Sequence, residues 1–237
     1  MNSMRRWIIY APYKRSFLVL FGTFAALTIA LVLFGVTGDA FETVFLGSEA
    51  TGVFLLLASS LLGSYVNIPV RQVTTRRPIV QVREVNVYGI TRRIPAIAYE
   101  SGTTLITVNL GGAVIPALFS VYLIGMFPST LPYAIIATLL VAGVTKLVTR
   151  PVPGVGMLAP VLVPPLNAAL AASLLGVAPH IVAYVAGSMG TLIGVDLLNF
   201  RAIADIGSPI VSIGGAGTFD GIFLSGIAAV LLAVTVS

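Results

Sequence analysis

The chain has 237 residues, of which 57% are hydrophobic and only 9% are charged. A soluble domain carries about 25% charged residues, so this composition excludes an ordinary soluble globular protein and predicts a polytopic membrane protein. The 13 Lys and Arg residues exceed the 8 Asp and Glu residues, which gives a net charge of +5. These bases lie in short segments between apolar runs, a distribution that indicates membrane topology and predicts no nucleic-acid partner. The absence of cysteine and the single histidine exclude a thiolate or histidine-rich metal site.

Seven apolar segments are each long enough to cross a bilayer core about 30 Å thick, which needs roughly 20 helical residues. They predict an all-α polytopic membrane protein with about seven transmembrane helices, folded as a single membrane-embedded domain over residues 1–237. The first segment lacks the short apolar core and cleavage site of a secretory signal, so we interpret it as an uncleaved anchor. The predicted spans are residues 17–36, 48–66, 104–126, 130–148, 156–176, 179–199 and 217–236.

The Lys and Arg residues fall into four groups that seven spans would place on one side of the membrane. The groups are the N-terminus, the segment 67–103, the pair Lys146 and Arg150, and Arg201, while the loops on the other side hold no Lys or Arg. The positive-inside rule therefore predicts an N-terminus in the cytoplasm and a C-terminus outside. We interpret the chain as an integral protein of a prokaryotic plasma membrane.

Two segments on the predicted cytoplasmic side favour strands. The soluble insertion, about 67–103, contains an alternating, valine-rich run from Pro78 to Ile90 that predicts a small β-hairpin or edge strand. The loop 200–216 contains a second alternating run at 209–213. The arginines of the insertion suit lipid headgroup contact at about 1 kcal/mol each, and binding of acidic substrate tails is the alternative.

Prolines and glycines predict irregular and closely packed helices. Pro164 and Pro165 are adjacent, so the span 156–176 should be broken, either as a kinked packing helix or as the irregular wall of a polar cavity. The pairs Gly190/Gly194 and Gly217/Gly221 have the small-xxx-small spacing that lets helix backbones approach closely.

Two carboxylates lie near the cytoplasmic ends of the last two predicted spans. Asp196 is about three residues before one inner end and Asp220 is about three residues after the next inner beginning, so both lie about 5 Å inside the membrane. An ionised acid in a membrane span predicts a functional site. Two carboxyl groups at one depth would share a proton at neutral pH, which is the state that an aspartic protease needs, without metal or cofactor.

The run Asp220-Gly221-Ile222-Phe223-Leu224-Ser225, preceded by Gly217, resembles the Gly-x-Gly-Asp segment of presenilins and signal peptide peptidases. Asp196 occupies the place of the first catalytic aspartate of that family, and Pro116-Ala117-Leu118 matches its Pro-Ala-Leu motif. The chain differs from the family in having Phe219 at the second glycine, and in having Pro-Ala-Leu before the aspartates, which implies a divergent, permuted member. The resemblance implies that Asp196 and Asp220 are catalytic, and that substrate contacts Pro116, Ala117, Leu118, Gly217 and Phe219.

The function predicted from these residues is an intramembrane aspartyl protease that hydrolyses transmembrane peptide substrates within the lipid bilayer, with no cofactor. The alternative is a proton- or cation-coupled transporter that uses the same acids as a relay. The oligomeric state stays open.

Overall fold

The computed structural model describes residues 8–9, 22, 51–87, 90–152, 156–202, 208–215 and 221–236. These residues form six α-helices and two β-sheets, so the predicted all-α fold with about seven transmembrane helices is wrong. The predicted span 17–36, apart from Gly22, lies outside the described residues. The part of the chain that the structure describes is therefore a mixed α/β protein.

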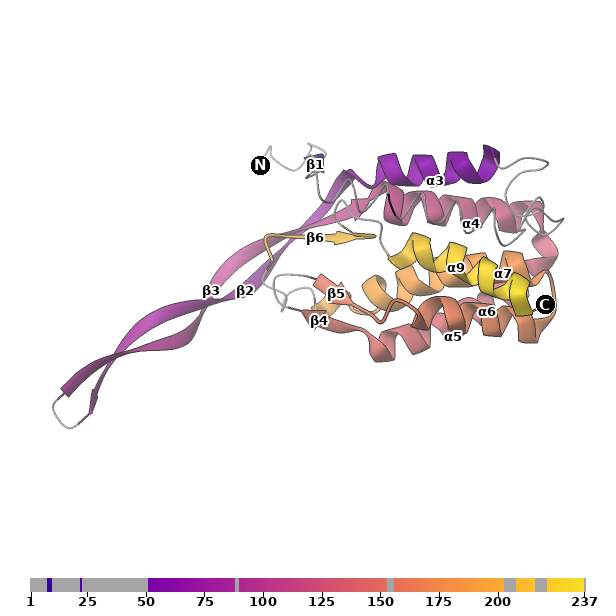
Figure 1. Cartoon of the computed structure of the whole chain (residues 1–237). Helices are drawn as coiled ribbons and strands as arrows, with labels where there is room; N and C mark the ends of the chain where they lie inside the picture. Colours follow the sequence, from indigo (N-terminus) through magenta and orange to yellow (C-terminus); the bar gives the residue numbers. More distant parts are fainter. Residues whose placement is uncertain are drawn as a thin grey trace.

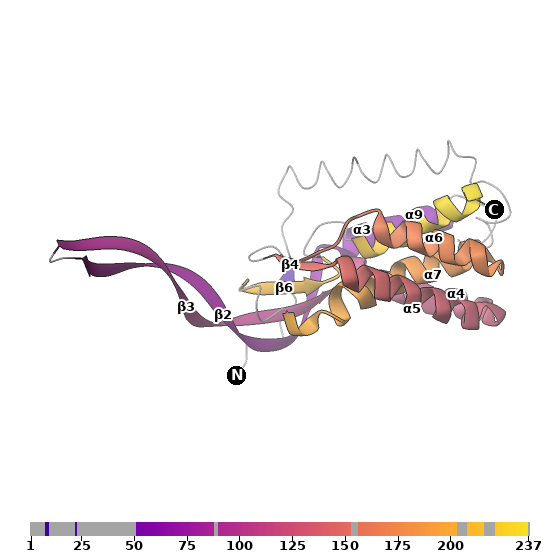
Figure 2. The same cartoon turned by 90° about the horizontal axis from the view of Figure 1, so that it is seen from below.

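The helices lie side by side in one bundle, and the strands gather at one of its ends (Figures 1 and 2). Helix α7 lies among its neighbours, because Ile181 to Ser188 are all buried. Two helical stretches, Pro128–Val148 and Pro179–Leu197, are long and apolar enough to cross a membrane. The helices are α3 (Thr51–Gly63), α4 (Ile115–Met126), α5 (Leu131–Val148), α6 (Val163–Leu175), α7 (Pro179–Thr191) and α9 (Gly221–Val236).

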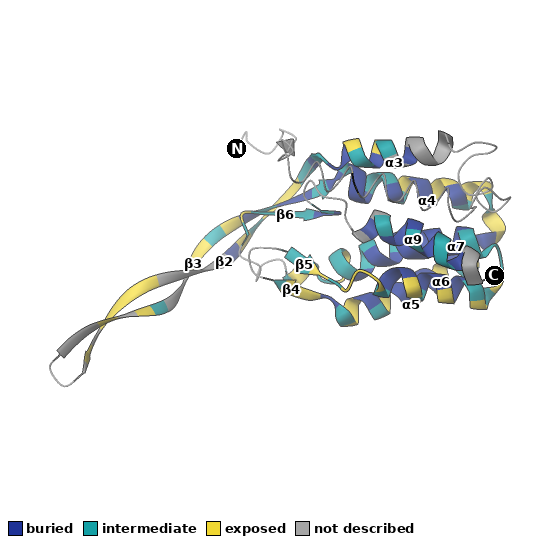
Figure 3. Cartoon of the chain, viewed as in Figure 1, coloured by how far each residue is buried: buried dark blue, intermediate teal, exposed yellow. Residues whose placement is uncertain are grey.

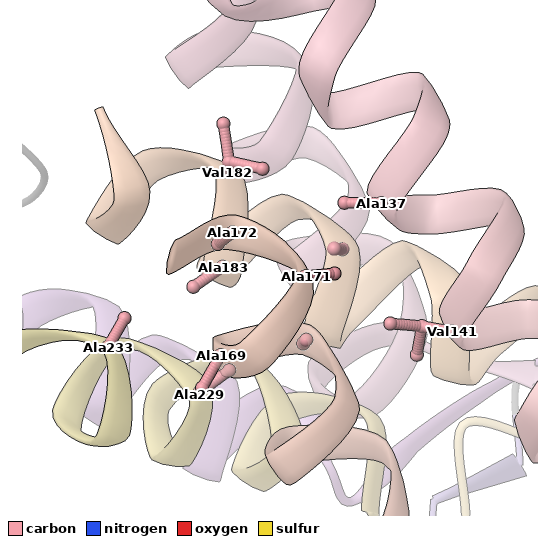
Figure 4. Packing of buried hydrophobic residues seen from close by; sticks show 11 residues of the cluster. Ala137, Val141, Ala169, Ala171, Ala172, Val182, Ala183, Ala229 and Ala233 are labelled. Atoms are coloured by element: carbon pink, nitrogen blue, oxygen red, sulfur yellow. The ribbon is translucent and has the colours of Figure 1, made fainter. Parts of the chain in front are cut away.

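The bundle has small side chains inside and large apolar side chains outside. Between α5, α6, α7 and α9 the buried cluster consists of alanines and valines (Figure 4). In contrast, α6 and the residue before it expose leucines at helical spacing, namely Leu162, Leu166, Leu170 and Leu174. Figure 3 shows the same division, with dark buried faces turned inward and exposed positions on the outer faces of α4, α5 and α6. This distribution is typical of helices that pack in a membrane, where small residues form the contacts.

The larger sheet has the strand order β1-β2-β3-β6. Strands β2 (Val66–Val87) and β3 (Ile90–Asn109) pair antiparallel from Asn67↔Asn109 to Val87↔Ile90. Strand β6 (Ile210–Ile213) pairs parallel with Leu105–Val108 of β3, and β1 (Ile8–Ile9) pairs with the start of β2. A second sheet joins β4 (Arg150–Val152) and β5 (Gly156–Leu158).

The two predicted strand regions, within 78–90 and 209–213, are confirmed, but the hairpin is far longer than predicted. Residues 104–109, assigned above to a membrane span, are the end of β3. Their sequence is rich in Thr, Ile and Val, and β-branched residues favour a pleated strand once a partner strand covers them. Apolarity alone could not distinguish this buried strand from a helix.

The adjacent prolines lie at the start of α6 and do not break its interior. Pro164 and Pro165 are buried in the first helical turn, which needs no N–H donors from them. The predicted span 156–176 is instead divided before the helix, because Gly156–Leu158 form a strand and the helix begins at Val163.

Gly187 of α7 sets the distance to α9. A Cβ atom at this position would lie 2.8 Å from the carbonyl oxygen of Ser225 and 3.1 Å from Cβ of Ala229. We expect Gly187→Ala to destabilise the protein by about 1 to 3 kcal/mol, because the two helices must separate. Gly143→Ala in α5 is the control: a Cβ there meets nothing within 4 Å, so helix propensity should stabilise it by up to about 1 kcal/mol. Thermal unfolding in detergent measures both, and equal effects would contradict the tight contact.

Candidate functional site

Asp196 lies at the strand end of the bundle, in the π-helical turn η3 (Leu192–Leu197) that continues α7. Its side chain is half-buried, and its Oδ2 accepts a hydrogen bond of 3.3 Å from the backbone N–H of Gly214. The end of η3 is fastened by the side-chain amide of Asn199, which donates to the carbonyl oxygens of Gly194 at 2.8 Å and Val195 at 3.1 Å. The carboxylate is thus held against the segment that follows β6.

Gly214 packs the segment that follows β6 against the turn that leads into α4. Its φ is +82°, and a Cβ would lie 2.6 Å from Cβ of Ala113 and 2.9 Å from the carbonyl carbon of Gly112. Both neighbours belong to η1 (Leu110–Val114), the π-helical turn that leads from β3 into α4. Only glycine combines this conformation with this close approach. The structure therefore brings Asp196, Gly214 and η1 together.

The Pro-Ala-Leu segment lies in the first turn of α4, directly after η1. Pro116 is buried, Ala117 is half-buried and the side chain of Leu118 is 63% exposed. Pro116 also takes part in the helix itself, since its carbonyl accepts a 2.8 Å hydrogen bond from the hydroxyl of Ser120. The segment begins at the same end of the bundle as Asp196, but Leu118 presents its side chain on the outer surface.

The remaining predicted site residues, Gly217, Phe219 and Asp220, lie outside the described residues, between Gly215 and Gly221. The structure does describe how the helices on either side of these residues, α7 and α9, are aligned with each other. Thr191 Oγ1 of α7 lies 3.1 Å from Ser225 Oγ of α9, and both residues are buried. Together with the Gly187–Ala229 approach, this contact makes the two helices antiparallel.

This register relates the chain positions next to the two aspartates. Val195, the residue before Asp196, is four positions beyond Thr191, and Gly221, the residue after Asp220, is four positions before Ser225. Each interval spans about 5 to 6 Å of helix. Val195 and Gly221 therefore lie at matched depths on adjacent helices.

A buried polar cluster, not assigned a role from the sequence, supports the site. The side-chain amide of Asn109 donates to the carbonyl oxygen of Ser64 at 2.6 Å and to Oδ1 of Asn67 at 3.3 Å. Its Oδ1 accepts from the N–H of Gly112 at 2.7 Å, and the hydroxyl of Ser212 donates to Oδ1 of Asn67. Both asparagines are fully buried. The two asparagines could have indicated this cluster from the sequence, because a side-chain amide that is buried without hydrogen-bond partners is costly.

The cluster links α3, β2, β3 and β6, and β6 leads into the segment that holds Asp196. Asn67 and Asn109 lie where β2 begins and β3 ends, Ser64 follows α3, and Ser212 is two residues before Gly214. Within the described part of the chain, no three His, Asp or Glu residues form a group that could hold a metal ion.

A family model described as "Protein of unknown function (DUF1614)" matches residues 61–232, which is well over half of the chain. The matched region includes the hairpin, η1, both aspartates and most of α9. No curated protein and no solved structure matches.

Proposed function

The chain belongs to the DUF1614 family, and we propose that it is an intramembrane aspartyl protease that uses the carboxyl groups of Asp196 and Asp220. The observation that carries the proposal is the Thr191–Ser225 contact, which sets the residues next to the two aspartates at matched depths. The half-buried Asp196, held by Gly214 six residues before Asp220, also supports it. The resemblance to presenilins and signal peptide peptidases supplies the reaction.

In this proposal the two carboxyl groups share one proton, because two adjacent carboxylates cannot both ionise at low energetic cost. The ionised group takes a proton from water while the water oxygen attacks the peptide carbonyl carbon. The protonated group donates its proton to the developing oxyanion. The aspartic acid formed by taking the proton from water then gives that proton to the amide nitrogen, and the C–N bond breaks so that the amine leaves. A hydroxyl of the tetrahedral diol returns a proton to the other aspartate, so the new carboxylic acid leaves with the water oxygen and the pair again holds one proton.

The proposed location is the prokaryotic plasma membrane, with the strand end of the bundle in the cytoplasm. The exposed leucines of α6 and the small buried residues of the bundle support a lipid environment. Every described Lys and Arg lies at the strand end, in β2, β3, β4, the last turn of α5 or the turn η4 (Phe200–Ala202). This asymmetry supports a cytoplasmic strand end.

A cleavage assay tests the activity. The full chain, reconstituted in lipid vesicles, is incubated with a labelled model transmembrane peptide from about pH 4 to about pH 8. We expect cleavage that requires both aspartates. Absence of such cleavage over the whole range would overturn the protease, and aspartate-dependent proton flux into the same vesicles would favour the transporter.

Cross-linking tests the geometry separately. Because the chain has no cysteine, the double variant Asp196→Cys/Asp220→Cys carries only the two thiols of interest. We expect a mild oxidant to link them, since a disulfide requires Cα atoms about 4.4 to 6.8 Å apart. The control is Asp196→Cys/Leu131→Cys, because Leu131 begins α5 at the opposite end of the bundle. Failure of the first pair to react faster than the control would contradict the proposed dyad.

A further inference from the structure

Three bases gather where α5 and η3 end. Lys146 lies in the last turn of α5, Arg150 follows that helix in β4, and Arg201 lies in η4. All three side chains are exposed, and none forms an ion pair with a described residue. We call these three residues the basic patch. Exposed cations without a partner in the described chain attract an anion from outside it.

The packing of the bundle brings the elements that carry the basic patch together. A Cβ atom at Gly194 of η3 would lie 2.8 Å from Cβ of Thr145 and 2.7 Å from the carbonyl oxygen of Ala142, so η3 lies directly against the last turns of α5. Met157 of β5, the strand that pairs with β4, and Phe200 of η4 pack against one apolar cluster. The backbone segments that hold the three bases therefore converge at the strand end of the bundle.

The basic patch lies at the depth where the apolar stretches of the bundle end. The two helical stretches that are long and apolar enough to cross a membrane end at Val148 and Leu197. Lys146 lies two residues before the first of these ends, Arg150 two residues after it, and Arg201 four residues after the second. Each base is thus within about 8 Å of an end. When the bundle spans a bilayer, as proposed above, the patch lies among the headgroups of the cytoplasmic leaflet.

Exposed leucines accompany the bases. Leu147, directly after Lys146, is 85% exposed, and Leu140, seven positions earlier on the same face of α5, is exposed too. An apolar side chain with this exposure gains free energy from contact with hydrocarbon and none from contact with water. The exposed leucines beside the patch are Leu147, Leu158, which lies opposite Arg150 in the small sheet, Leu197 and Leu198. The surface therefore combines positive charge with apolar side chains.

Contacts within the chain leave part of the basic patch unexplained. The negative end of the α5 dipole favours Lys146 in the last helical turn, but Arg150 and Arg201 lie outside α5. Asp196, at the same end of the bundle, is half-buried and carries at most one negative charge. Its carboxylate cannot balance three bases, so among the described residues this surface keeps a net positive charge.

We propose that the basic patch binds the headgroup of an anionic phospholipid in the cytoplasmic leaflet, and that the leucines beside it contact the acyl chains. An acidic protein or a nucleic acid matches the charge but leaves exposed leucines such as Leu147 against polar groups. An anionic phospholipid matches both features, because its phosphate is negative and its chains are apolar. In this arrangement the methylene stem of Lys146 lies in hydrocarbon and its ammonium group reaches the interface. The inference rests on the proposed membrane location and requires neither aspartate.

Fluorescence quenching in lipid vesicles tests the proposal on the full chain. Because the chain has no cysteine, Leu147→Cys supplies one thiol for a fluorophore beside the patch. The vesicles consist of phosphatidylcholine with a small fraction of nitroxide-labelled phosphatidylglycerol or, in parallel, nitroxide-labelled phosphatidylcholine as the quencher. We expect phosphatidylglycerol to associate about 10²-fold more strongly, because each base near an anionic lipid contributes about a fivefold gain. Roughly 0.5 M salt should reduce this preference. The control label is Leu131→Cys, at the opposite end of α5, which both lipids should quench equally.

Variants locate the site. Arg150→Gln/Arg201→Gln should lower the preference for phosphatidylglycerol at the Leu147→Cys label about 20- to 30-fold. The matched control, Arg71→Gln/Arg83→Gln, removes two exposed arginines from the β2–β3 hairpin, which projects beyond the bundle (Figures 1 and 2). It should leave the preference within about twofold, since exposed charges more than about 10 Å away are largely screened.

Asp196→Asn should keep the lipid preference, so failure of this test and failure of the cleavage assay are distinguishable. Equal quenching by the two lipids at Leu147→Cys, equal loss in both double variants, or the same preference at Leu131→Cys would each overturn the proposal. Displacement of the labelled phosphatidylglycerol by an acidic peptide of equal charge would also overturn it, in favour of a protein partner.

Discussion

Asp196→Asn and Asp220→Asn are each expected to lower peptide cleavage by about 10³-fold or more, because residues that act as a unit lose nearly all their effect together. Asparagine keeps the size of the side chain but can neither take the proton from water nor hold the shared proton. Cleavage of the labelled transmembrane peptide under single-turnover conditions measures the loss. The double variant should be no slower than either single variant.

The control for this experiment is Glu84→Gln, which removes an exposed carboxylate from strand β2. This variant should leave cleavage within about twofold, since exposed ion pairs contribute little. Partial activity in one aspartate variant with complete loss in the other would contradict a shared-proton pair. It would fit a relay of acids instead, and proton flux in vesicles would then be the informative measurement.

Asn109→Ala is expected to destabilise the protein by about 3 to 5 kcal/mol, one of the larger effects of a single substitution. The change leaves the carbonyl oxygen of Ser64, the N–H of Gly112 and Oδ1 of Asn67 with one hydrogen bond fewer each. An unsatisfied buried group costs about 1 to 3 kcal/mol. Chemical unfolding of the full chain in mild detergent measures the loss.

Asn86→Ala is the matched control, because Asn86 is an exposed asparagine of strand β2. Its effect should stay within about 0.5 kcal/mol. If the two variants unfold at the same denaturant concentration, the buried cluster does not stabilise the junction between the β2–β3 hairpin and the helices. If Asn109→Ala also lowers cleavage under conditions in which all of the variant protein is folded, the cluster positions η1 at the site.

Prediction from the sequence succeeded for features that depend on a few neighbouring residues. The alternating runs within 78–90 and 209–213 predicted strands that the structure contains, and glycine spacing predicted the tight contacts of α7. Asp196 was expected about three residues before the end of its helix, and it lies in η3, which continues α7 and ends at Leu197. In each case a few neighbouring residues determine the result.

Prediction failed where distant segments decide the structure. Residues 104–109 are apolar enough for a membrane helix, yet pairing with β2 on one side and β6 on the other makes them a strand. The helix register set by Thr191 and Ser225 joins residues 34 positions apart, and hydropathy carries no information on it. The pairing of Asn67 with Asn109 likewise depends on the hairpin register, which the turn and the partner strand determine together.

The central position of α7 has a consequence for biosynthesis. The ribosome makes α4, α5 and α6 before α7, so α7 can settle against them while α9 is not yet translated. Until then Gly187 and Thr191 face the vacant position of α9. A nascent chain that stalls before Asp220 would therefore display a polar, glycine-lined helix face, which membrane quality-control systems could recognise. Asp196 would meanwhile be present without Asp220, so the proposed activity could arise only after the last helix has joined the bundle.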